Sequence, residues 1–245
     1  MWAKLGTSLS FVLLSGYIIS LWLGGNLSAY IHPRYHLFTV IMIALCGMAA
    51  LIDIIHTLYR HHRALRTERP TQPDIVSSIV IIVLLLGIIL PPQSLSLHAA
   101  TTRARDTNDS LPFAPTQTAA CHPPETGQQG NTLLYRWLSA VHACATPDDF
   151  VGEAITMVGF ITEQPDDLRS FYLTRFLVSC CAVDSTPLRV RVIAPTWRTD
   201  HTPGQWLRVE GKVAKDRTGA LVITDATLTP INQPASPYEF LGSLE

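Results

Sequence analysis

The chain has 245 residues, of which 47% are hydrophobic and only 15% are charged, and its net charge is -1. Soluble domains carry about 25% charged residues, so this composition excludes a disordered chain and is unlike that of an ordinary cytosolic enzyme. Charge is also unevenly divided: residues 1–93 carry six basic and three acidic side chains, whereas the rest carries twelve and sixteen. Two unlike parts therefore share one chain. The net charge of the chain gives no general case for binding of nucleic acid.

Three apolar runs fill the first part, at residues 9–27, 37–58 and 75–90. A bilayer core of about 30 Å needs roughly 20 apolar residues in a helix, and the first two runs meet that length. The third is shorter and ends at Pro91-Pro92, so it can span only where the bilayer thins or flanking residues help. We expect a three-helix transmembrane domain over residues 1–93.

The loop after the second run predicts the orientation of these helices. Residues 59–69 contain four arginines, and short arginine-rich loops mark the cytoplasmic side of a membrane. The N-terminus is then cytoplasmic and the chain after residue 93 is extracytoplasmic. Only Arg34, in the predicted outer loop, opposes this orientation. We therefore expect a multi-pass protein of the cell membrane.

Asp53 and His56 lie late in the second apolar run, three residues apart, and so share one face of the predicted helix. Ionisable side chains inside a bilayer are costly and often functional. The alternative, which we favour, is that both lie near the cytoplasmic headgroups and form hydrogen bonds there.

Residues 94–130 are rich in Pro, Thr, Ser, Gln and Asn and have no apolar period, which predicts a flexible polar tether. Cys121 and His122 lie within it. One Cys-His pair in such a segment is a weak indication of a metal site.

Residues 131–245 are predicted to form a short helix followed by an all-β domain. Apolar residues recur every three or four positions over 132–145, as on one face of a helix. Five segments with a period of two then follow, at 153–163, 171–181, 188–194, 205–214 and 220–228. Glycines inside strands suit the bends of a small barrel, so we expect an OB-like fold. Many such folds bind nucleic acid on basic faces, but this part is acidic and predicted to be extracytoplasmic.

The segment Cys180-Cys181-Ala182-Val183-Asp184 is the strongest candidate for a chemical site. Thiolate and carboxylate groups are good Zn²⁺ ligands, so we expect these two cysteines and this aspartate to bind a metal, with Zn²⁺ as the first candidate. Neighbouring side chains of a strand point to opposite faces, so both cysteines can reach one ion only if the strand ends or bulges there. Arg175 could hold a thiolate or carboxylate in place, and His201 could supply a fourth ligand.

Other roles for these cysteines stay open. Cys180 and Cys181 could form a disulfide with each other, or pair with Cys121 or Cys144, or be inert thiols; in an oxidising compartment disulfides are common. Cys46 is expected only to pack within the membrane. The sequence has no phosphate loop, His-Glu-x-x-His motif, Gly-x-Ser-x-Gly elbow or Cys-x-x-Cys motif, so we expect no enzyme, with a thiol redox enzyme as the third alternative.

Several motifs together carry a family resemblance. They are His32-Pro33-Arg34, Gly159-Phe160-Ile161, Arg175-Phe-x-x-Ser-Cys-Cys-Ala-x-Asp184, Trp206-x-x-Val-x-Gly211 and Pro234-x-x-Pro-Tyr238. On these residues the chain resembles the YcgQ-like family of two-part permease subunits over nearly its whole length. The resemblance implies a separate multi-spanning permease partner of the ArsP-like type and a role in transport, but no reaction.

The leading hypothesis is an accessory subunit of a membrane permease, with an extracytoplasmic OB-like domain that binds a ligand or metal. The alternative is a membrane-anchored assembly module whose cysteines are structural and which binds no ligand of its own.

Overall fold

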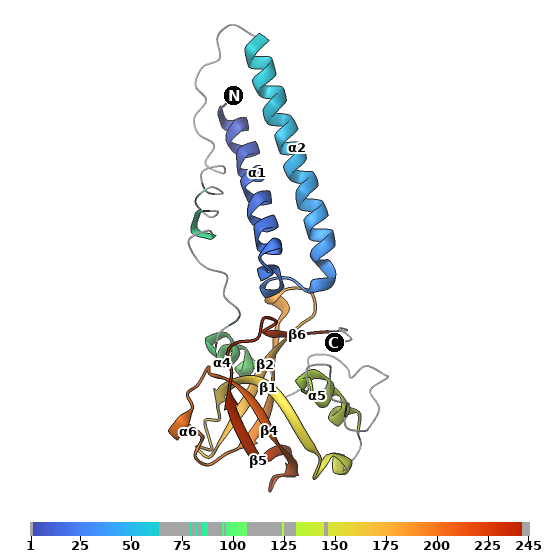
Figure 1. Cartoon of the computed structure of the whole chain (residues 1–245), viewed down its shortest axis with the longest axis vertical. Helices are drawn as coiled ribbons and strands as arrows, with labels where there is room; N and C mark the ends of the chain where they lie inside the picture. Colours follow the sequence, from blue (N-terminus) through green and yellow to red (C-terminus); the bar gives the residue numbers. More distant parts are fainter. Residues whose placement is uncertain are drawn as a thin grey trace. The chain divides into compact units, whose positions relative to one another are not determined.

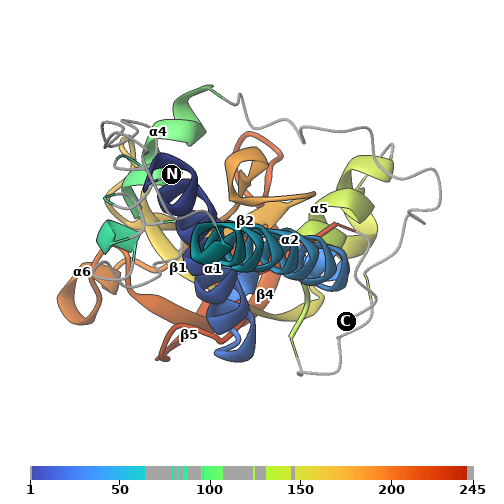
Figure 2. The same ribbon diagram turned by 90° about the horizontal axis from the view of Figure 1, so that it is seen from above.

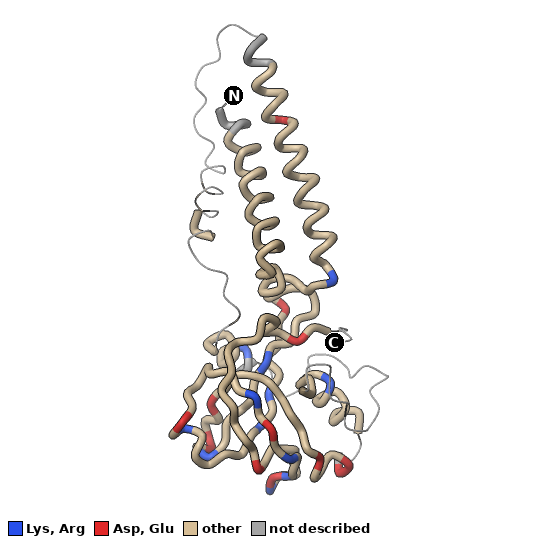
Figure 3. The backbone as a smooth tube through the Cα atoms, viewed as in Figure 1, with Lys and Arg blue, Asp and Glu red and all other residues tan. Residues whose placement is uncertain are grey.

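The computed structural model describes residues 2–63, 79, 82, 85–87, 95, 97–106, 124, 131–144 and 147–241. The chain divides into two compact units, residues 1–93 and 94–245, each considered by itself (Figure 1). Few charged side chains lie on the two long helices of the first unit, and most of those in the described residues belong to the second (Figure 3).

The first unit is built on two helices, α1 (Trp2–Leu23) and α2 (His36–Arg63), joined through the short 3₁₀ turns η1 (Asn26–Ala29) and η2 (Pro33–Tyr35). Both helices are long and apolar enough to cross a membrane. Of the third predicted span, residues 75–90, only 79, 82 and 85–87 are described, and these are helical. Two candidate spans are therefore found, and the third stays a prediction.

Small side chains let α1 and α2 approach closely. A Cβ on Gly47 would lie 2.9 Å from Ser15 Oγ, and that hydroxyl also donates a hydrogen bond to Ile43 O at 3.1 Å. Tyr17 of α1 donates a 2.9 Å hydrogen bond to Gly87 O, in the third apolar run. Close contact through Gly and Ser, supplemented by hydrogen bonds, is the usual way helices associate in lipid.

Among its described residues, the second unit has three helices and six strands. They are α4 (Leu97–Asp106), α5 (Leu134–Ala143), β1 (Ala154–Glu163), β2 (Ser170–Val178), β3 (Thr186–Ile193), α6 (Trp197–Asp200), β4 (Trp206–Lys215), β5 (Leu221–Pro230) and β6 (Tyr238–Phe240), with the 3₁₀ turns η3 (Pro147–Phe150) and η4 (Ala182–Asp184). The predicted helix and all five predicted strands are present, with ends within a few residues of those expected. The helices α4 and α5 lie on different sides of the strands (Figures 1 and 2).

The first five strands form a closed barrel. Their order is β1-β4-β5-β3-β2, and β1 also pairs with β2, which closes the ring. The third strand β3 runs parallel to β5, whereas β1, β2 and β4 make antiparallel pairs. The short β6 adds to β2 outside the ring. This pattern confirms the predicted five-stranded barrel with a helix before it and fits an OB-like fold.

Two glycines allow the strands to bend within the ring. A Cβ on Gly159 would lie 2.7 Å from Thr174 O of the neighbouring strand, and one on Gly211 would lie 2.6 Å from Ile223 Cγ2. The pairing of β4 with β5 shifts register between Glu210 and Lys212, which is a bulge. Sharp bends of this kind exclude a side chain, so glycine is needed at both positions.

The aliphatic side chains of β4 form its inner face. Leu207 and Val209 are fully buried in the barrel, whereas Arg208 is half-exposed. Trp206 is partly exposed and packs beside Phe160, with ring centroids 5.5 Å apart. The smaller aliphatic side chains therefore fill the barrel interior, and the large indole lies outside it.

The helix α4 corrects the predicted tether. The segment 94–130 was expected to be flexible, but residues 97–106 form a helix. Ala100 of this helix is 1% exposed and packs in a second apolar cluster with residues such as Phe176 and Tyr238. Leu97 and Ala100 recur three residues apart, a helical spacing that the polar composition around them obscured. Except for residues 95 and 124, the rest of the segment lies outside the described residues.

Candidate functional site

The cluster of Cys180, Cys181 and Asp184 lies in the turn between β2 and β3. The second strand ends at Val178, three residues before the predicted end at 181, and the turn η4 begins at Ala182. Both cysteines therefore lie outside the strand, and the alternation that would direct them to opposite faces does not apply. Their Sγ atoms are 3.6 Å apart.

Asp184 organises this turn. Its carboxylate accepts hydrogen bonds from three successive backbone N–H groups, those of Ser179 at 3.3 Å, Cys180 at 2.8 Å and Cys181 at 3.4 Å. A carboxylate three to five residues downstream can here satisfy N–H groups that the turn leaves without backbone partners. The backbone is thereby folded around the carboxylate, and the two cysteine side chains are brought beside it.

The arrangement fits a metal ion. The two Sγ atoms and a carboxylate oxygen of Asp184 all lie within 4.8 Å of one another. Tetrahedral Zn²⁺ with Zn–S bonds of about 2.3 Å places two sulfur ligands about 3.8 Å apart, close to the separation of the two thiols. Cys180 is exposed and Cys181 is partly exposed, and both are free thiols. The ligand atoms predicted from sequence are thus already gathered on one side of the turn.

The charge of Asp184 also affects the neighbouring thiol. Partial burial acts to raise the pKa of Asp184, but hydrogen bonds from the Cys180 thiol and from the backbone outweigh it, and the pKa lies below the ordinary value. Conversely, the hydrogen bond to Asp184, followed by the one to Cys181, raises the pKa of Cys180 to about 11. At neutral pH Cys180 is therefore a protonated thiol that donates to a carboxylate.

Arg175 does not hold this cluster, contrary to the prediction. It is 6% exposed, lies 3.9 Å from the Glu239 carboxylate and donates a 2.7 Å hydrogen bond to Ser236 O. Glu239 is 3% exposed and accepts hydrogen bonds from the backbone N–H groups of Leu134 and Tyr135, at 2.9 and 2.7 Å. The buried pair therefore joins β2 and β6 to the start of α5 and has a structural role.

His201 also lies apart from the cysteines. It follows α6 and lines a second cavity together with Trp197 and Asp225, and it is not part of the cluster of metal-ligand atoms found among the described residues. In the membrane unit, Asp53 accepts a 2.7 Å hydrogen bond from Ser8 of α1, while His56 is exposed on α2. No described contact joins these three residues to the candidate site.

One residue of the site was missed by the sequence analysis. Arg103 of α4 donates from Nη1 to Ala182 O at 3.2 Å and to Ser185 O at 3.0 Å, and also contacts Ser185 Oγ. These acceptors flank Asp184 in the turn. Arg103 follows Leu97 and Ala100 at the same three-residue spacing, so a helical reading of the supposed tether would have placed all three on one face.

Comparison with known families covers most of the chain. The DUF1980 N-terminal domain matches residues 8–105, and the DUF1980 C-terminal domain matches residues 134–241. The chain belongs to the DUF1980 family. The first match includes α1, α2 and α4, and the second includes α5 and the whole barrel. Arg103 therefore lies in one family domain and the turn that it contacts lies in the other.

A relative of this DUF1980 chain is known from Streptococcus mutans serotype c. The two are 24% identical over 275 residues, which cover 94% of this chain and 98% of the relative, and that protein is provisionally named a two-component membrane permease complex subunit. This agrees with the family resemblance found from the sequence motifs. No solved structure matches the chain.

The remaining cysteines of this DUF1980 chain have separate roles. Cys144, at the end of α5, is disulfide-bonded, whereas Cys46 of α2 is a free thiol. Cys180 and Cys181 are free as well, so neither the vicinal disulfide that was left open as an alternative nor a pairing of either with Cys144 is present. Cys121 lies outside the described residues. A structural disulfide and a free thiol pair therefore coexist in the second unit.

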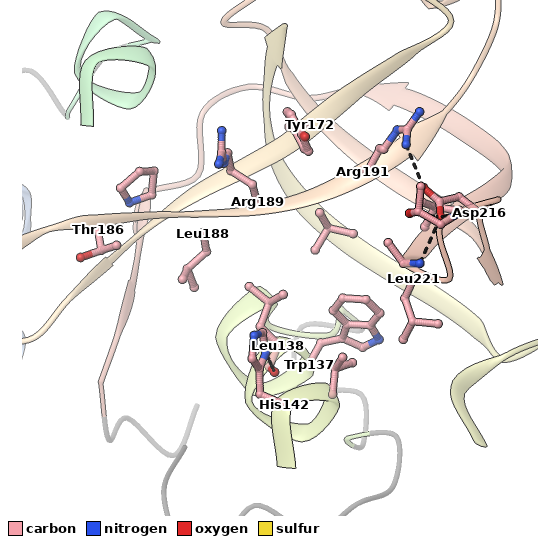
Figure 4. A pocket seen from close by; sticks show the side chains of 16 residues that line it. Trp137, Leu138, His142, Tyr172, Thr186, Leu188, Arg189, Arg191, Asp216 and Leu221 are labelled. Atoms are coloured by element: carbon pink, nitrogen blue, oxygen red, sulfur yellow. Dashed lines mark hydrogen bonds and ion pairs between the residues drawn. The ribbon is translucent and has the colours of Figure 1, made fainter. Parts of the chain in front are cut away.

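A cavity of about 320 Å³ lies between α5, β3 and the turn after β4. Leu188 points toward α5, whereas Arg189 and Arg191 lie on the other side of β3 (Figure 4). Arg191 is bonded to Asp167 at 2.8 Å and to Asp216 at 3.0 Å. These contacts join the turns at one end of the barrel, and they explain the charges along this wall without a ligand.

Proposed function

We propose that this protein is the accessory subunit of a two-part membrane permease and that its β domain binds a metal ion through Cys180, Cys181 and Asp184. Zn²⁺ is the first candidate, because it accepts mixed sulfur and oxygen ligands. The family relationship and the two apolar helices support the membrane role. The observation that carries the metal site is the convergence of three ligand atoms within 4.8 Å.

The exposure of the cluster favours reversible binding. Cys180 is exposed, and Val183 beside it is 85% exposed. Three protein ligands leave one position of a tetrahedral ion for water or for a group of the partner, whereas closed structural zinc sites have four protein ligands. A subunit that receives an ion and passes it on needs such an open position.

Two observations support an extracytoplasmic location of the β domain. Cys144 is disulfide-bonded, and disulfides persist mainly in oxidising compartments. The four arginines of residues 59–69 also favour a cytoplasmic loop before the third apolar run. The thiols of Cys180 and Cys181 then lie on the extracytoplasmic side of the membrane, where they can meet a solute that enters or leaves the cell.

The partner is proposed to be a separate multi-spanning permease subunit of the ArsP-like type. The name of the Streptococcus relative describes a two-component complex. This supports a second subunit, the permease itself, beside this one. One face of α2 is open along its length, with Phe38, Leu45 and Ile52 all more than half exposed. Such a face suits lipid or an apolar partner helix.

The raised pKa of Cys180 argues against a thiol redox enzyme. The thiolate is the reactive form, and reactive cysteines have a lowered pKa. Here the hydrogen bond to the Asp184 carboxylate raises the pKa of Cys180 to about 11. A bound cation would instead favour the thiolate, so the same geometry suits an ion better than nucleophilic attack.

Metal titration of the full chain in lipid nanodiscs tests the proposal. We expect one Zn²⁺ per chain in the parent protein, and none at the site in Cys180→Ser or Cys181→Ser. Cys46→Ser is the matched control, because it removes a free thiol outside the cluster and should leave binding intact. Circular dichroism checks that each variant is folded.

Parent protein that binds no Zn²⁺ with its thiols reduced would remove the metal site from the proposal. If Cys180→Ser and Cys181→Ser also unfolded the domain, the cysteines would be structural, and the assembly-module alternative would replace the metal site.

A further inference from the structure

The turn that carries the candidate ligands is held from within by two backbone hydrogen bonds and by the Asp184 carboxylate. Its only internal backbone hydrogen bonds in the described chain are Asp184 N to Cys181 O at 3.1 Å and Ser185 N to Ala182 O at 3.4 Å. Val183 at its tip is 85% exposed and adds no apolar burial. Its other internal bonds all go to one side chain, that of Asp184, and a single 3₁₀ turn is a short piece of structure with few bonds. Contacts from outside the turn therefore add to the support that Asp184 gives.

Arg103 supplies such contacts from a different part of the chain. One guanidinium nitrogen reaches the carbonyl oxygens of Ala182 and Ser185, at 3.2 and 3.0 Å, and the Ser185 hydroxyl. These two residues bracket Val183 and Asp184. Hydrogen bonds from a charged donor are about twice as strong as neutral ones, so Arg103 fixes both ends of the turn to α4.

The helix α4 is itself firmly attached to the barrel. Ala100 is 1% exposed within the cluster that contains Phe160, Phe176 and Tyr238. Just before the helix, Leu95 N donates a 2.8 Å hydrogen bond to the Tyr238 hydroxyl. The packing of α4 on the barrel therefore holds Arg103 in place next to the turn.

We infer that Arg103 is a positioning residue for the candidate ion site: docking of α4 on the barrel holds Cys180, Cys181 and Asp184 in their converged arrangement. This inference rests on the proposed function. Groups that orient metal ligands without touching the metal commonly change metal affinity by 10- to 100-fold when removed. The site would then be complete only while α4 is docked.

The arrangement would also couple ion binding to the docking of α4. The helix α4 begins seven residues after Leu90, the last residue of the third apolar run. Loss of the docked state of α4 would remove the guanidinium from the turn, loosen the ligand set and release the ion. Binding of the ion would, by the same linkage, stabilise docked α4.

Zinc affinity of Arg103 variants tests the inference in the full chain in nanodiscs, with a chelating dye as competitor. We expect Arg103→Ala to weaken Zn²⁺ binding by about 10- to 100-fold. Arg103→Lys should recover part of the loss, because it keeps a charged donor with a different shape. Arg198→Ala is the matched control: Arg198 lies on α6, where it pairs with Glu163 at 3.0 Å, and its loss should leave affinity unchanged.

Hydrogen exchange without metal separates this inference from the metal site itself. In Arg103→Ala, the backbone N–H groups of Cys180 and Cys181 should exchange faster, whereas those of the barrel strands should keep their protection. Unchanged exchange at both cysteines would overturn the positioning role even if zinc binds. If the parent chain binds no zinc, the metal proposal fails, and faster exchange would still establish that Arg103 orders the turn. Equal zinc affinity in Arg103→Ala and the parent would overturn the inference.

Discussion

At the scale of single residues, Asp184 is the group on which the site depends. Its carboxylate receives three backbone N–H groups and the Cys180 thiol, so it both folds the turn and sets the state of the neighbouring cysteine. A cation near these atoms would compete with the thiol proton for the same negative charge. Binding of the ion and loss of the proton are therefore coupled.

The first prediction concerns this proton. Because the pKa of Cys180 is raised to about 11, the free site holds a proton throughout the neutral range, and Zn²⁺ must displace it. Apparent zinc affinity should therefore rise at least about tenfold per pH unit between pH 6 and 8. Calorimetry in buffers of different ionisation enthalpy measures the protons released. Binding that releases no proton would contradict coordination by the thiolate.

The second prediction concerns the buried pair of Arg175 and Glu239. Removing one member of a buried pair leaves the other charge without its partner, which costs about 3–5 kcal/mol. Arg175→Met and Glu239→Leu should each lower the free energy of unfolding by about this amount, measured with denaturant. The double variant should lose less than the sum of the two. A fully additive loss would mean that the two side chains do not stabilise each other.

At the scale of elements, the phase of each strand decides which side chains the barrel buries. In β4, the apolar residues Leu207 and Val209 fill the interior, and Gly211 lets the strand bend. In α4, one small residue, Ala100, allows close packing on aromatic side chains. The barrel strands and α4 are the packed elements that the short turn η4 contacts.

The third prediction follows from the phase of β4. Val209→Asp should unfold the β domain, because it buries a charge without a partner in a fully buried position. Arg208→Ala, on the half-exposed face, should change the free energy of unfolding by less than about 1 kcal/mol. Thermal unfolding followed by circular dichroism compares the two. Similar tolerance of both changes would show that β4 is not buried as described.

At the scale of the whole molecule, the chain combines a unit with helices suited to lipid and a compact β unit. The two differ in chemistry as well as in fold, since most of the charged side chains lie in the second (Figure 3). On the proposed function, the first unit would stay in the membrane beside the partner, and the second would carry the ion site. The proposed division of function follows the division of the chain.

The fourth prediction concerns the side of the membrane on which each part lies. In intact cells that carry Cys46→Ser, Cys180→Ser and Cys181→Ser, a maleimide that cannot cross membranes should label from outside a cysteine introduced at Val183, which is 85% exposed. A cysteine introduced at His62, within the arginine-rich loop, should be labelled only after the cells are opened. The reverse pattern would place the N-terminus outside and the thiols in a reducing compartment.

Local patterns determined most of the architecture. The apolar runs of residues 9–27 and 37–58 predicted α1 and α2, and a period of two predicted all five barrel strands within a few residues. These features depend on neighbouring residues along the chain, through the geometry of one helix or one strand. The ligand set of Cys180, Cys181 and Asp184 was also found from sequence, because its members lie within five residues of one another.

Contacts between distant segments were decided only by the tertiary structure. Arg175 was expected to hold the cysteines five and six positions away or Asp184, but it pairs with Glu239, which lies more than sixty residues further along. Arg103 was hidden in a supposed tether, yet it fixes the turn around Asp184. A charged side chain forms its strongest contact with whichever partner the fold buries beside it, and the sequence alone does not specify which segments the barrel brings together.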